Sequence, residues 1–73
     1  MSSISRVLER HGDKIAAGLL KAAGSPLVRD VELENGIYEI RVFYVLADGT
    51  RLEGRPLDID DLAQEYPDCG IGY

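Results

Sequence analysis

The spacing of apolar residues changes once along this chain of 73 residues, and that change constrains the fold more than any other feature. Over residues 3–23 the apolar side chains and one histidine recur at steps of three and four, the period of one helix face. From Val28 the step becomes two, the period of a strand with one buried face. Gly24 and Pro26 separate the two regions, because glycine supplies a left-handed helix end and proline cannot continue a helix. The pattern predicts an amphipathic helix followed by a β-sheet.

Two turn signals divide the second region into three predicted strands, at residues 28–34, 37–46 and 50–57. Asn35-Gly36 is a strong hairpin signal, because a two-residue type I′ turn needs positive φ at both central positions. Asp48-Gly49 marks the second turn, and Pro56 ends the third strand or confines it to a sheet edge. These strands predict a three-stranded antiparallel meander.

A short second helix is expected over residues 59–66. Asp58 is a suitable N-cap, and the apolar stripe comprises Ile59, Leu62, Ala63 and Tyr66. Pro67 ends this helix, and residues 67–73 form the tail. Two fates are open for its last part, Cys69 to Tyr73: a loose end or a short strand on a sheet edge. The expected fold is one α+β domain over residues 1–73, in which the N-terminal helix packs on the meander and the short helix follows.

Two glycines interrupt the first predicted helix. Gly12 and Asp13 could mark a break, with Asp13 capping a second helical segment. Gly18 lies among alanines, and we expect it to let the helix approach the sheet closely. Each glycine costs up to about 1 kcal/mol relative to alanine inside a helix.

The register of the meander follows from its turns. A two-residue loop at Asn35-Gly36 pairs Leu33 with Tyr38, and a three-residue loop at residues 47–49 pairs Leu52 with Tyr44. The longer second loop is preferred because a one-residue slip would turn Leu52 away from the core. The apolar face, here called face A, is predicted to contain Val31, Leu33, Tyr38, Ile40, Val42, Tyr44, Leu46 and Leu52. The opposite face, face B, carries Glu32, Glu34, Ile37, Glu39, Arg41, Phe43, Val45, Arg51, Glu53 and Arg55.

Face B mixes charged residues with an apolar patch at Phe43 and Val45, and three interpretations are open. The C-terminal helix could cover this face and bury Phe43. A second copy of the chain could cover it, directly or through an exposed edge strand. Another protein could bind it, since an apolar centre with a charged rim is the usual anatomy of a recognition surface.

Composition narrows the class of function. The net charge is −5, with an excess of basic residues before residue 30 and of acidic residues after it, so a protein that tracks nucleic-acid phosphates is not expected. One cysteine and one histidine exclude an internal disulfide and make a zinc site very unfavourable. With neither a signal peptide nor a membrane span in evidence, we expect a cytoplasmic protein that has no membrane association.

The residues with reactive or metal-binding side chains do not form a catalytic set. His11 falls on the apolar stripe of the first helix, and the sequence offers no nucleophile or orienting acid to act with it. A packing role for His11 is therefore favoured over a catalytic one. Cys69 has no cationic neighbour to activate its thiol. Asp58, Asp60 and Asp61 are better explained by helix capping than by a cation site, because the spacing does not match a calcium loop. We expect no enzyme activity, no cofactor and no metal.

The sequence therefore favours a small acidic protein that binds another protein. In size and charge it resembles the inhibitors and regulators of phages and mobile elements, such as anti-CRISPR proteins. Its partner would be a larger protein with a basic surface, such as one that handles nucleic acid. The alternative is a structural or assembly subunit that forms a homodimer through the sheet. The residues predicted to bind the partner are Ile37, Glu39, Arg41, Phe43, Val45, Glu53, Asp60, Asp61 and Glu65.

Overall fold

The computed structural model describes residues 3–69 of the chain. Within that range the order of elements is helix, four strands, helix and a 3₁₀ turn: α1 (Ser3–Ala23), β1 (Val28–Asn35), β2 (Glu39–Leu46), β3 (Arg51–Glu53), β4 (Leu57–Asp58), α2 (Ile59–Glu65) and η1 (Pro67–Cys69). The α+β class and the order predicted from the sequence are confirmed, apart from the division of the third strand. The alternative of an edge strand formed by the tail concerns residues 70–73, which lie outside the described residues.

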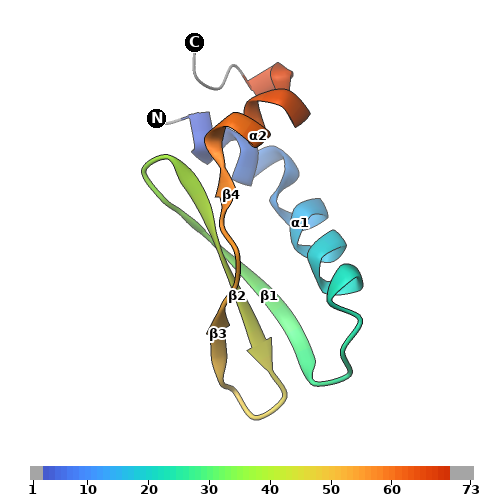
Figure 1. Ribbon diagram of the computed structural model, residues 1–73. Coiled ribbons are helices and arrows are strands. Elements are labelled where there is room, and N and C mark those ends of the chain that lie inside the picture. Colours follow the sequence, from blue (N-terminus) through green and yellow to red (C-terminus); the bar gives the residue numbers. More distant parts are fainter. Residues whose placement is uncertain (1–2, 70–73) are drawn as a thin grey trace.

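Both helices lie on face A of the antiparallel sheet (Figure 1). The main core combines side chains from α1, the sheet and α2: Ile4, Val7, Ile15, Ile40 and Leu62. In the centre of this core Ile40 is fully buried and Leu62 is 2% exposed. The prediction that α1 covers face A is confirmed, whereas the interpretation in which α2 covers face B and buries Phe43 is wrong. The apolar stripe of α2 is short, and it completes the same core that α1 begins.

The first hairpin does not turn at Asn35-Gly36. The amide of Gly36 donates to the carbonyl of Glu39 (2.8 Å), so the two-residue loop is Ile37-Tyr38. Leu33 consequently lies opposite Val42 rather than Tyr38. The observed register pairs the end of β2, Tyr44 to Leu46, with β1, whereas the predicted register would place that end opposite residues 25–27, before the strand begins. This added pairing overrides the local preference for the Asn-Gly turn. Since the register moves by an even number of residues, face A and face B keep their apolar and charged characters.

The second turn follows the prediction. Leu52 pairs with Tyr44, and Gly49 has a φ of +91°, the conformation expected for the last residue of a three-residue loop. The amide of Thr50 donates to Asp48 Oδ1 (2.9 Å), and this bond lowers the pKa of Asp48. The expected burial of Leu52 is wrong, since this side chain is 51% exposed: α1 packs mainly over β1 and leaves β3 uncovered.

The predicted third strand is divided by a bulge into β3 and β4, both of which pair with β2. Leu52 pairs with Tyr44 and Leu57 pairs with Ile40, so the register shifts by one residue between the two strands. Such a shift reverses the side-chain alternation. It returns Leu57 to face A, where Leu57 packs against the core.

Gly54 lies in this bulge, against an aromatic ring. A Cβ atom on Gly54 would overlap the Tyr44 ring, whereas a Cβ atom on Gly18 would meet no atom within 4 Å. The expectation that Gly18 brings α1 close to the sheet is therefore wrong. The possible break at Gly12 is also absent, because α1 is continuous. Asp58 does occupy the N-cap of α2, but it makes no side-chain capping hydrogen bond.

Alanine substitutions at these two glycines should have opposite effects on the free energy of unfolding. Gly54→Ala should lower the free energy of unfolding by about 1–3 kcal/mol, because the Tyr44 ring or the backbone must move. Gly18→Ala should raise it by up to about 1 kcal/mol, because glycine is the poorer helix former and the site is open. Urea unfolding of both variants measures the difference. Equal effects of the two substitutions would contradict the bulge geometry.

Candidate functional site

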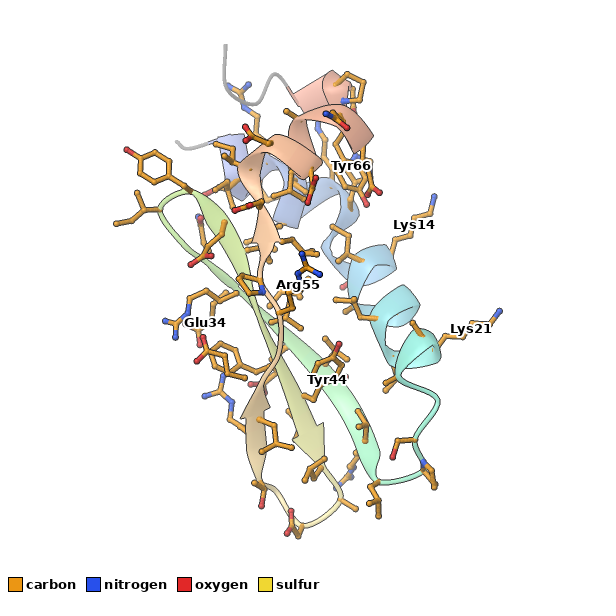
Figure 2. All side chains as sticks on the ribbon, viewed as in Figure 1. Lys14, Lys21, Glu34, Tyr44, Arg55 and Tyr66 are labelled. Atoms are coloured by element: carbon orange, nitrogen blue, oxygen red, sulfur yellow. The ribbon has the colours of Figure 1, made fainter. Side chains whose placement is uncertain are left out.

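The residues predicted to bind a partner lie on two separate parts of the structure. Six of them lie on β2, on β3 or in the first hairpin loop: Ile37, Glu39, Arg41, Phe43, Val45 and Glu53. The other three, Asp60, Asp61 and Glu65, lie on α2, which packs on face A. The single acidic surface expected from the sequence is therefore two surfaces, because α2 lies on the side of the sheet opposite Phe43. Figure 2 shows Glu34 and Tyr44 on opposite sides of the sheet.

Phe43 is covered by arginine side chains. The guanidinium carbon of Arg51 lies 4.5 Å from the centre of the Phe43 ring, and that of Arg41 lies 5.3 Å from it. Both distances fit cation–π contacts, each worth about 0.5–1 kcal/mol at an exposed site. Phe43 is thus half-buried, and it lies outside the core in which α2 packs.

Carboxylates hold these two arginines over the ring. Arg41 donates to Glu53 (3.1 Å), which raises the pKa of Arg41. Arg51 contacts Glu32 (2.9 Å) and Glu34 (3.3 Å) on β1, on the far side of β2. Exposed ion pairs of this kind contribute little stability individually. Their effect here is geometric, since they order the centre of face B as a flat, mixed-charge surface.

An acidic hollow of about 690 Å³ lies at the first-hairpin end of the sheet. Its lining comprises Glu34, Asn35, Gly36, Ile37, Tyr38, Glu39, Arg41, Glu53 and Asp58. The lining thus contains four carboxylates and one guanidinium, that of Arg41, which is already paired with Glu53. The hollow combines four of the predicted residues, Ile37, Glu39, Arg41 and Glu53, with the carboxylates of Glu34 and Asp58, which were not predicted to bind.

Two large side chains stand exposed beside this hollow. Ile37 is 83% exposed and Tyr38 is 71% exposed, both in the two-residue loop of the hairpin. The prediction that Tyr38 lies on the buried face A is therefore wrong. No local signal marks it as exposed, because its position follows from the register. The carbonyl of Tyr38 accepts a hydrogen bond from the amide of Ile59 (3.0 Å), which ties the loop to the start of α2.

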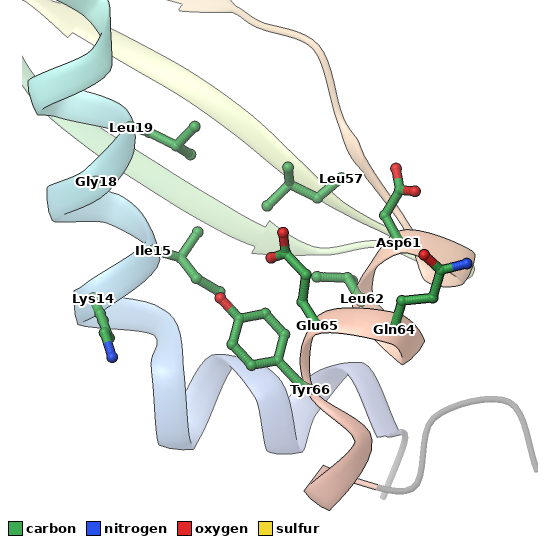
Figure 3. A pocket seen from close by; sticks show the side chains of 10 residues that line it. All are labelled: Lys14, Ile15, Gly18, Leu19, Leu57, Asp61, Leu62, Gln64, Glu65 and Tyr66. Atoms are coloured by element: carbon green, nitrogen blue, oxygen red, sulfur yellow. The ribbon is translucent and has the colours of Figure 1, made fainter.

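A second hollow of about 570 Å³ separates α1 from α2 and β4. Figure 3 shows Leu19 of α1 and Leu57 of β4 pointing toward one another across it. Lys14 lies on the α1 side, and the predicted residues Asp61 and Glu65 lie on the α2 side. This interhelical hollow has an apolar floor and opposite charges on its walls, so its charge favours neither an acidic nor a basic partner.

His11 has a packing role. Its ring stacks on Tyr66, with centroids 4.5 Å apart and planes inclined by 26°. Its Nε2 atom lies 3.5 Å from Asp68 Oδ2, too long for a good hydrogen bond, and it forms no hydrogen bond within residues 3–69. These contacts join α1 to η1. Over the same residues, no group of three or more His, Cys, Asp or Glu side chains is placed to share a metal ion.

Comparison with known proteins identifies no relative: no protein-family model, no curated protein and no solved structure matches the chain. Neither α1 nor any other helix in residues 3–69 has the length and hydropathy needed to cross a membrane.

Proposed function

We propose that this protein is a non-catalytic binding domain that holds a basic segment of a larger protein in the acidic hollow. The observation that carries the proposal is the exposure of Ile37 (83%) and Tyr38 (71%) beside four carboxylates. Large apolar and aromatic side chains, tyrosine above all, supply most of the energy at protein interfaces when a partner removes them from water.

The charges of the hollow favour a cationic partner. Glu53 is paired with Arg41 and Glu34 with Arg51, but no ion pair within residues 3–69 involves Glu39 or Asp58. Glu39 and Asp58 lie directly opposite one another on β2 and β4. Two like charges placed so close repel, and a lysine or arginine of the partner would relieve that repulsion. Complementary charge would also increase the association rate and make binding sensitive to salt.

The biological role that fits such a surface is inhibition or regulation. The acidic hollow can hold the lysine or arginine side chains with which a larger protein binds nucleic acid, and Tyr38 packs beside them as the anchor. The partner is then a nucleic-acid-handling protein, and nucleic acid competes with this chain for those basic side chains.

Affinity capture with matched variants tests this function. The wild-type protein should retain a partner that high salt or an added oligonucleotide releases. Tyr38→Ala should weaken capture at least about tenfold, equivalent to about 1.4 kcal/mol. Leu27→Ala is the control, because Leu27 is also largely exposed (67%) but precedes β1, away from the hollow. Equal loss of capture in both variants, or capture that is indifferent to salt, would contradict the proposal.

Self-assembly is the second candidate function. Leu27 and Leu52 are large apolar side chains more than half exposed, outside the acidic hollow. Small domains with thin cores often gain stability by association. Light scattering separates the two functions: a dimer that Leu27→Asp and Leu52→Asp dissociate favours assembly, and a monomer over a wide concentration range favours binding of another protein.

A further inference from the structure

We propose that the outer edge of β1 is a second binding site, which accepts an extended basic segment of another protein as an added strand. The proposal goes beyond the function assigned to the acidic hollow. It concerns a different surface of the molecule, where strand β1 and helix α1 run side by side.

The first observation is an open strand edge. Within residues 3–69, β1 pairs only with β2, although β1 is eight residues long. The bond from the Gly36 amide to Glu39 sets the ladder, so Glu32 and Glu34 exchange hydrogen bonds with β2. Val31 and Leu33 therefore direct their backbone groups outward. An exposed row of such groups is a template for another strand.

One outward group is already occupied. The Val31 amide donates to Asp30 Oδ1 (2.8 Å), a bond to the side chain of the preceding residue. A bulge between Val28 and Asp30 also ends the regular ladder there. Bulges and charged side chains are the usual protection of an edge against indiscriminate pairing. Val31 as a whole is only 6% exposed, so the groups left for an added strand at the centre of the edge are the amide and the carbonyl of Leu33.

The second observation is a groove that runs along this edge on face A. It has a volume of about 280 Å³ and is lined by Leu8, Gly12, Asp13, Ala16, Val31 and Leu33. Gly12 and Ala16 present small surfaces at its α1 wall, and a Cβ atom on Gly12 would meet no atom within 4 Å. An added strand lies roughly 4.8 Å from its neighbour and directs alternate side chains to each face. Its apolar side chains would enter this groove.

The acidic side chains around this edge favour a basic segment as the added strand. On the opposite face the added strand would lie beside Glu32 and Glu34, which share the single guanidinium of Arg51. Asp13 on the groove wall and Asp30 at the bulge add negative charge, and Arg29 within the bulge is the one basic residue of β1. The fitting segment therefore alternates apolar residues with lysine or arginine. A second copy of β1 fits poorly, because antiparallel pairing would place its glutamates beside Glu32 and Glu34 of this chain, and like charges repel.

A synthetic probe tests the site directly. The probe is an acetylated seven-residue peptide that alternates valine with lysine, and its control replaces each lysine with glutamate. NMR of the full chain should show saturable, salt-sensitive shifts centred on residues 31–34 with the lysine peptide alone. Exchange of the Leu33 amide with solvent should slow at least tenfold on saturation, because that amide gains a hydrogen bond. Shifts confined to Ile37–Glu39, or no saturable binding, would overturn the proposal.

Two variants of α1 provide a matched pair. Gly12→Leu fills the groove at β1 and should weaken the lysine peptide at least tenfold. Gly18→Leu adds the same side chain at an open position on the interhelical hollow and should leave the affinity unchanged. Both replace glycine with a better helix former, so both should fold. Equal affinities, or protection of Leu33 by dimerisation without peptide, would overturn the proposal. Neither result depends on Tyr38, so a failure of this proposal leaves the function proposed for the acidic hollow to its own test.

Discussion

Ile40→Ala should lower the free energy of unfolding by about 3–4 kcal/mol, the typical cost of removing a large aliphatic side chain from a packed core. Ile40 is fully buried on the central strand, in one cluster with Ile4, Val7 and Leu62. These residues come from α1, β2 and α2, so a cavity at Ile40 loosens three elements together. A domain of this size has a total stability of roughly 4–11 kcal/mol, so this one substitution should remove at least about a quarter of it.

The matched control lies three residues earlier in the chain. Ile37→Ala removes the same atoms from a side chain that is 83% exposed, and it should change stability by less than about 0.5 kcal/mol. Urea unfolding of both variants measures the contrast. The same Ile37→Ala variant should weaken capture of a basic partner, because Ile37 stands beside the acidic hollow. Similar losses of stability in the two variants would show that the hairpin turns elsewhere.

Leu62→Ala should lower the free energy of unfolding by about 2–4 kcal/mol, whereas Phe43→Ala should lower it by only about 1–2 kcal/mol. Leu62 is 2% exposed within the main core, and its loss detaches α2 from α1 and Ile40. Phe43 is the larger side chain, but its ring is covered by Arg41 and Arg51, which can re-solvate when the ring is removed.

Thermal or urea unfolding of these two variants shows which face of the sheet α2 covers. If α2 covered face B, Phe43→Ala would be the more damaging change, since a buried phenylalanine typically contributes 3–5 kcal/mol. Helical circular dichroism of Leu62→Ala provides a second measurement, because a loosened α2 should reduce the signal before the main transition. An unchanged helical signal together with the larger loss in Phe43→Ala would contradict the structure.

The elements were predictable because their signals are local. The apolar steps from Ile4 to Leu19 specify one face of a helix, and the glycine at position 24, with a φ of +61°, ends it as predicted. The alternation from Val31 onward specifies strands with one apolar face. The three-residue turn that ends at Gly49 was also correct, although Leu52, whose burial was the reason for expecting it, is 51% exposed.

The first turn was not predictable from the same kind of signal. Asn35-Gly36 has the stronger local preference, but the observed loop at Ile37-Tyr38 lets the end of β2, Tyr44 to Leu46, pair with β1 as well. Pairing along a strand sums many small contributions, and that sum exceeds the preference of one dipeptide. The exposure of Tyr38, and with it the acidic hollow, depends on this outcome.

The helices, the strand-forming segments and the division of the sheet into an apolar and a charged face could be predicted, because the periodicity of apolar residues is a property of near neighbours in the chain. The register of the first hairpin, the bulge at Gly54 and the packing of α2 on face A beside Leu57 emerged only from the folded molecule. Those features depend on contacts between residues far apart in the chain, where the burial of Leu62 and the close approach of Tyr44 to Gly54 select one arrangement. The open edge of β1 and the acidic hollow follow from that selection.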